Sequence, residues 1–131
     1  MSVTIKTVSS RKDFKTFARF ANRLYKGNKY YVPSMPMDDL STFSKEKNAA
    51  FEFSEAEFYL AYKDGEVAGR VAAIINHKAN DAWKVKQVRF GWIDFIDDLE
   101  VSAALLDAVI EFGRKAGMTQ IVGPLGFTDF D

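Results

Sequence analysis

The segment 88–123, VRFGWIDFIDDLEVSAALLDAVIEFGRKAGMTQIVG, constrains the fold of this chain more than any other part. Its first half is an apolar run typical of a strand, and this run ends at two adjacent acids, Asp97 and Asp98. An amphipathic helix is expected over about 99–116, where Gly117 stops it and a second apolar strand begins. This order of elements predicts a sheet with a helix packed on it.

The amino-terminal part adds a strand and a helix. Alternation of apolar and polar residues over 3–8, VTIKTV, predicts a half-buried strand. Ser10 is the expected N-cap of the helix, with Asp13 as its capping-box partner. The helix then carries an apolar stripe at spacings of three and four residues, made of Phe14, Phe17, Ala21 and Leu24.

A hairpin is expected in the middle of the chain. Asp64-Gly65 joins the apolar runs 58–62 and 67–75, and Asp-Gly between such runs is a strong hairpin signal. Gly69 inside the second run indicates a bulge or a close approach by another backbone. We expect 76–86 to be a polar connection that leads to the strand 88–96.

These elements predict one α/β (α+β) domain over 1–131, in the order β-α-loop-β-β-β-α-β, with residues 28–57 as the loop. Three antiparallel strands followed by a helical crossover give a mixed, mostly antiparallel sheet flanked by helices.

Composition excludes several functions. The chain has no Cys, and no His, Asp and Glu cluster has the spacing of a metal site. No apolar run approaches ~18 residues, and the first residues do not resemble a signal peptide, so we expect a cytoplasmic protein with no membrane contact.

Charge is zero overall but unevenly distributed. Residues 1–31 carry eight Lys and Arg against one acid, whereas 94–111 carry six acids and no base. One interpretation of this charge separation is two solvated helix faces that attract each other across the fold. The alternative is a basic patch that binds an anionic ligand. Nucleic acid is not expected, because the chain is neutral and has no nucleic-acid motif.

The chain resembles the GNAT superfamily of N-acetyltransferases, and in particular a bacterial branch of it. The resemblance lies in LYKGNKYYVPSM (24–35), FYLAYKDGEVAGRVAAIIN (58–76), FGWIDFIDD (90–98) and LLDAVIEFGRKAGMTQIVGP (105–124). It implies an acyl-CoA N-acyltransferase-like fold and acyl transfer from acetyl-CoA, or another acyl-CoA, to a small-molecule amine. The cofactor-binding positions that it implies are Phe95, Ile96, Asp97, Ser102 and Ala104.

The turn before the last helix departs from the family pattern. Where the family has a basic residue and glycines that hold a pyrophosphate, this chain has Asp97, Glu100 and Ser102. We expect Asp97 and Glu100 to form a capping box, which places carboxylates where phosphates would bind. At ~4 Å, two like charges near a surface cost about 4 kcal/mol. The sequence therefore predicts weak binding of acetyl-CoA.

Length is the second departure. Family domains continue past the last strand with a helix and a hairpin, so we expect this chain to lack that C-terminal part. The final strand would then be an open edge, which predicts a homodimer formed by strand addition.

Asp94 is the candidate catalytic base. It lies in the apolar context WIDFI, on the strand where family members often carry a catalytic glutamate. Its alternative role is structural, hydrogen-bonded to backbone or paired with Arg70 or Arg89. The single histidine, His77, is expected at the surface.

Two functional classes remain open from sequence. One is an acyl-CoA-dependent N-acyltransferase, incomplete in this chain. The other is a non-catalytic module that keeps the acyltransferase fold and binds a small molecule or a protein.

Overall fold

The computed structural model describes residues 3–24 and 54–123. Within them the elements are β1 (Val3–Thr7), α1 (Arg11–Leu24), β2 (Ser54–Lys63), β3 (Glu66–Asn76), α3 (His77–Trp83), β4 (Gln87–Phe95), α4 (Leu99–Lys115) and β5 (Gln120–Val122). Most of the expected loop, 28–57, lies outside these ranges.

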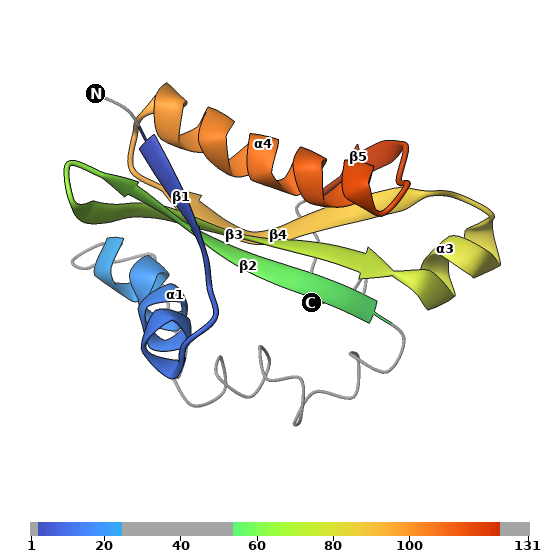
Figure 1. The fold of residues 1–131 in the computed structure, drawn as a ribbon, viewed down its shortest axis with the longest axis horizontal. Helices are drawn as coiled ribbons and strands as arrows, with labels where there is room; N and C mark the ends of the chain where they lie inside the picture. The colour runs from blue at the N-terminus through green and yellow to red at the C-terminus, as the bar shows by residue number, and fades with distance from the viewer. Residues whose placement is uncertain (1–2, 25–53, 124–131) are drawn as a thin grey trace.

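The sheet has the strand order β1-β2-β3-β4-β5. The first four strands are antiparallel neighbours, and β5 joins β4 in parallel after the crossover through α4. This confirms the mixed, mostly antiparallel sheet predicted from the sequence. Helices α1 and α4 lie on opposite faces of it (Figure 1).

Each face of the sheet has its own apolar core. On the α1 face, Phe17 packs edge-on against Phe58 from β2, with ring centroids 5.3 Å apart. On the α4 face, the buried residues of the helix recur every four positions, so one side of α4 meets β3 along its length; these residues are Val101, Leu105, Val109 and Gly113.

The hairpin turn, the start of α1 and the end of α4 lie at the residues that the sequence predicts. Asp64 and Gly65 have φ of 55° and 79°, as a two-residue type I′ hairpin turn requires. The Ser10 hydroxyl accepts a hydrogen bond from the Asp13 N–H at 3.1 Å. Gly117 has φ of 81° and ends α4 in a Schellman arrangement, in which the Met118 N–H donates to the Gly113 carbonyl at 2.8 Å.

The expectation of a polar connection over 76–86 is wrong, because α3 occupies most of it. Asn76 caps this short helix, and its side-chain oxygen accepts from the Ala79 N–H at 2.9 Å. The buried Asn80 side chain then donates to the Gln87 carbonyl at 3.0 Å and so fixes the start of β4. Asn76 was therefore an overlooked N-cap signal.

Strand β5 is the last strand of the described sheet, and the predicted homodimer through it stays a prediction. Two details of β5 define its outer edge. Gln120 donates its N–H inward, to the Lys86 carbonyl at 3.0 Å, so the outward donor is at Ile121. The Ile121 side chain is 42% exposed and does not lie in the core.

Substitution Ile121→Pro therefore tests the dimer. It removes the outward N–H while the Gln120 bond to β4 remains, so we expect the dimer fraction at high micromolar concentration to fall sharply. Light scattering measures this mass, and a melting curve of the variant controls for folding. A monomeric wild-type chain would contradict the prediction.

Candidate active site

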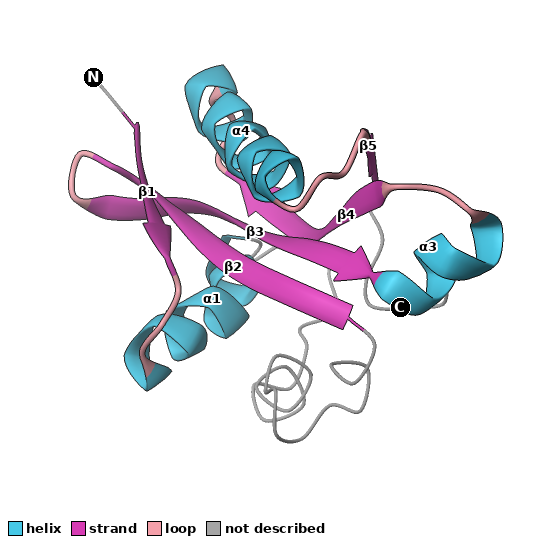
Figure 2. Cartoon of the chain, turned by 45° about the vertical axis from the view of Figure 1, so that its right-hand side comes forward, coloured by secondary structure: helices cyan, strands magenta, loops and turns pink. Residues whose placement is uncertain are grey.

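Strand β5 pairs along its whole length with the first part of β4. Their parallel ladder consists of Gln87–Gln120, Val88–Ile121 and Arg89–Val122, whereas β4 has nine residues and continues to Phe95. The two strands therefore share a short ladder, beyond which β4 runs on toward the N-terminus of α4 (Figure 2).

A bulge interrupts β4 in this stretch. Gly91 pairs with Ala72 and Asp94 with Arg70, so Trp92 and Ile93 together oppose the single residue Val71. Trp92 has a φ of 44°, an uncommon conformation for a bulky residue. Such a bulge bends the strand and turns peptide groups out of the regular ladder.

The bulge also decides which way the β4 side chains face. Val88 and Phe90 belong to the core under α4, as does Ile93, three residues after Phe90. Trp92 instead packs in the core under α1. Since side chains alternate again after the bulge, Asp94 shares the α1 face with Trp92. An unbroken strand would have turned Asp94 toward α4.

Asp94 forms an ion pair with Arg70. The Arg70 Nε donates to Asp94 Oδ2 at 3.0 Å, and Nη2 lies 3.0 Å from the same oxygen. The Arg70 side chain is 6% exposed, and its Nη1 donates to the Phe17 carbonyl at 2.7 Å. Pairing with Arg70 was one of the alternatives left open by the sequence, and a catalytic role for Asp94 stays a prediction.

The turn between β4 and α4 holds the expected carboxylates, but the capping box is wrong. The N-cap is Asp98, one residue later than expected, and Glu100 is the second residue of the helix. Asp98 Oδ1 accepts from the Glu100 N–H at 2.9 Å. Asp97 is exposed at the surface of the turn.

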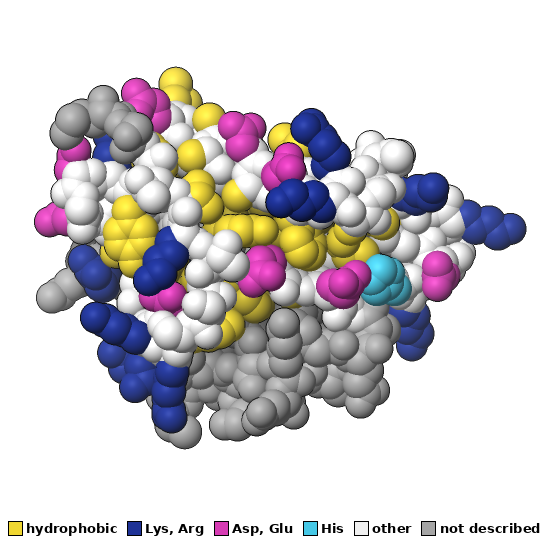
Figure 3. Space-filling model, in the orientation of Figure 1, with side chains coloured by type: hydrophobic (Ala, Val, Ile, Leu, Met, Phe, Trp, Pro, Cys, Tyr) yellow, Lys and Arg dark blue, Asp and Glu magenta, His cyan; other side chains and the backbone are white. Residues whose placement is uncertain are grey.

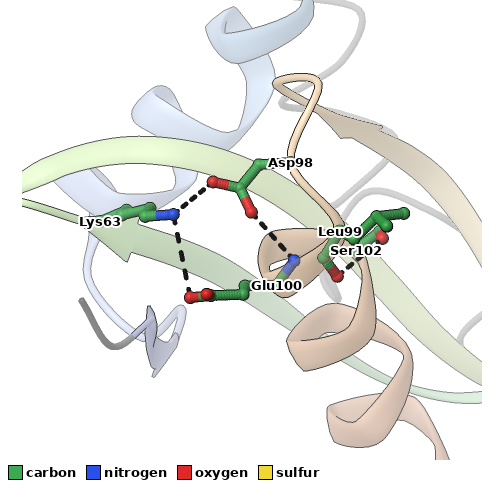
Figure 4. Close-up of polar contacts among 5 residues, drawn as sticks. All are labelled: Lys63, Asp98, Leu99, Glu100 and Ser102. Atoms are coloured by element: carbon green, nitrogen blue, oxygen red, sulfur yellow. Dashed lines mark hydrogen bonds and ion pairs between the residues drawn. The ribbon is translucent and has the colours of Figure 1, made fainter.

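Lys63, at the end of β2, reaches this turn from the hairpin (Figure 4). Its ammonium donates to Asp98 Oδ2 and lies 3.8 Å from Glu100 Oε2. The hydrogen bond from Lys63 holds the pKa of Asp98 below its usual range and raises the pKa of Lys63. Both groups are therefore charged at neutral pH.

The remaining predicted cofactor positions surround the same turn. Phe95 and Ile96 are each 37% exposed, and the Ile96 N–H donates to the Ala68 carbonyl at 2.9 Å. Ser102 is half-buried, and its hydroxyl donates to the Leu99 carbonyl at 3.1 Å. Ala104 is half-buried on α4. The structure thus gathers Phe95, Ile96, Asp97 and Ser102 around the helix start.

His77 lies at the surface, as expected, and contacts Glu55 at 2.6 Å. No group of three potential metal ligands occurs among the described residues. None of the helices in 3–24 and 54–123 is long and apolar enough to cross a membrane. Figure 3 shows one group of basic side chains over α1, and others elsewhere on the same view. The sheet lies between α1 and α4, which carries Glu100 in its first turn and Arg114 and Lys115 in its last.

Solved structures share this fold at low sequence identity. A tandem GNAT protein from the clavulanic acid biosynthesis pathway superposes with a TM-score of 0.67 at 12% identity, over 92% of this chain and 35% of that protein. AAC(6′)-Iy, in complex with the bisubstrate analogue CoA-S-monomethyl-acetylneamine, gives 0.66 at 15% identity, over 96% and 81%. The chain therefore has the fold of the GNAT acetyltransferases, as its sequence predicted.

Among curated proteins, YghO of Escherichia coli (strain K12) is 28% identical over 120 residues. The match covers 92% of this chain and 30% of YghO, so the chain spans less than a third of that relative. No protein-family model matches the chain.

The residues at the start of α4 do not fit the diphosphate of a CoA molecule. A phosphate at a helix N-terminus is held by free N–H groups and favoured by positive charge. Here the Asp98 carboxylate already accepts from the first turn, and Asp97 and Glu100 add negative charge beside it. Among residues 3–24 and 54–123, Lys63 is the cation paired with this turn, and it is engaged by Asp98.

Proposed function

We propose that this chain provides the acyl-donor side of an N-acyltransferase, which transfers an acyl group from a thioester to an amine. One observation carries the proposal: β4 bulges at Trp92 in the stretch where its ladder with β5 has already ended. Because the chain shares the fold of the GNAT acetyltransferases, we place acyl transfer at this stretch of β4. We also propose that the protein acts in the cytoplasm.

The role of the chain's own atoms follows from this geometry. A thioester arm laid along β4 would be held by main-chain hydrogen bonds, as an added strand is. Peptide N–H groups that the bulge redirects would then be aimed at the thioester oxygen, where negative charge develops during attack by the amine. The α1 face, which carries Asp94, is where we place the amine.

The donor S-acetyl-pantetheine tests the proposal without requiring a known amine. We expect it to shift the backbone amide NMR signals of Phe90–Phe95 and of β5, and to leave α3 unchanged. Absence of shifts at millimolar donor, or shifts centred elsewhere, would favour the non-catalytic binding module instead.

A further inference from the structure

The N-terminus of α4 is occupied by a side chain of the protein itself. Asp98 Oδ1 accepts the Glu100 N–H at 2.9 Å, and the Asp98 main-chain carbonyl accepts the Ser102 N–H at 3.2 Å. The first turn thus has an anion at its positive end, supplied from within the chain.

Lys63 holds this anion in place from a distant part of the sequence. The two residues are 35 positions apart, and the side chains are only 21% and 20% exposed. Ala61 lies in the core under α4, so Lys63, two residues later on β2, points to the same face. A cation that could otherwise approach a phosphate is therefore used to anchor Asp98.

We propose that Asp98 and Lys63 are specificity determinants, and that the acyl donor is recognised through its thioester arm and not through a diphosphate. This rests on the proposed function and names its donor class: an acyl thioester of a pantetheine-type arm. The diphosphate of acetyl-CoA adds no affinity, because its place at the helix start is taken by a carboxylate and bordered by Asp97 and Glu100.

Calorimetric titration of the chain with acetyl-CoA and with S-acetyl-pantetheine tests this. For the wild type we expect dissociation constants within about threefold of each other, since the two donors share the arm that binds. In Asp98→Asn the cap is kept but its charge is removed, and Lys63 becomes available. This variant should bind acetyl-CoA about tenfold more tightly, with S-acetyl-pantetheine unchanged.

Two further variants sharpen the experiment. Asp107→Asn removes one charge from an exposed position of the same helix, and it should change neither affinity. Lys63→Met frees Asp98 but leaves its charge, so it should give no gain for acetyl-CoA. The gain in Asp98→Asn should shrink with added salt, because it depends on a contact between Lys63 and phosphate.

The outcomes separate the two proposals. If wild type binds acetyl-CoA at least about tenfold more tightly than S-acetyl-pantetheine, the inference is overturned and the proposed function stands. An equal gain in Asp107→Asn would also overturn it, because overall charge would then be the cause. If neither donor binds at millimolar concentration, the proposed function fails, and the inference fails with it.

Discussion

Asp94→Asn is expected to destabilise the protein strongly. The change removes the counter-charge of Arg70, whose guanidinium is buried against Phe17 and 6% exposed. A buried ion pair that loses one partner costs about 3 kcal/mol, because the remaining charge is uncompensated. For a chain of this size that corresponds to a fall in melting temperature of about 10 °C.

The same variant separates the two roles of Asp94. A structural carboxylate gives the lower melting temperature and leaves acyl transfer by the folded fraction intact. If Asp94 is also the catalytic base, the folded fraction loses acyl transfer in addition, because breaking the pair with Arg70 lowers the melting temperature in either case. Asp107→Asn is the matched control, since Asp107 is exposed on α4.

A double variant checks the cause of the loss. In Arg70→Met with Asp94→Leu both charges are gone, so no buried charge is left uncompensated. We expect this pair to be more stable than Asp94→Asn alone, which would show coupling between the two positions. A double variant as unstable as the sum of its single changes would contradict the ion-pair explanation.

Local signals were sufficient for much of the fold. The Asp64-Gly65 turn and the Gly117 stop were predictable because each depends on a backbone conformation that few residue types adopt. The N-cap of α4 was misplaced by one residue, since Asp97 and Asp98 are chemically identical and only the geometry shows which one caps the helix.

The candidate site was less predictable, because it depends on contacts between distant residues. Nothing in the neighbourhood of Lys63 indicates that its ammonium meets Asp98 at the start of α4. The bulge at Trp92 has one local signal, Gly91 inside the strand, but that glycine does not indicate that Asp94 faces Arg70. Pairing with Arg70 was one of the alternatives that the sequence left open, beside Arg89 and backbone hydrogen bonds, since a carboxylate in an apolar context needs a partner.

Gly69→Val is expected to have the other large effect, because it acts where α4 meets the sheet. A Cβ at Gly69 would lie 2.8 Å from Leu105 Cδ1, 3.0 Å from Val101 Cγ1 and 3.1 Å from Phe95 Cβ. The sequence indicated a bulge or a close approach by backbone. The structure has a register shift beside Gly69, between Ala61 and Tyr62 on β2, and the close approach is by side chains.

Overpacking of this kind costs about 1–3 kcal/mol. The Ile96 N–H donates a hydrogen bond to the carbonyl of Ala68, which is next to Gly69. Displacement of α4 should therefore also disturb the β4–α4 turn. We therefore expect Gly69→Val to lower the melting temperature and to alter the amide NMR signals of residues 96–100, which include both Asp98 and Glu100.

Leu105→Ala provides the test of cause. Alone it removes a fully buried side chain and costs about 2–5 kcal/mol. Combined with Gly69→Val it makes room for the new methyl groups, so the double variant should lose less stability than the two single losses added together. Additive losses in chemical denaturation would contradict the steric explanation, and Gly69 would then matter through its backbone, at the register shift, and not through its contact with α4.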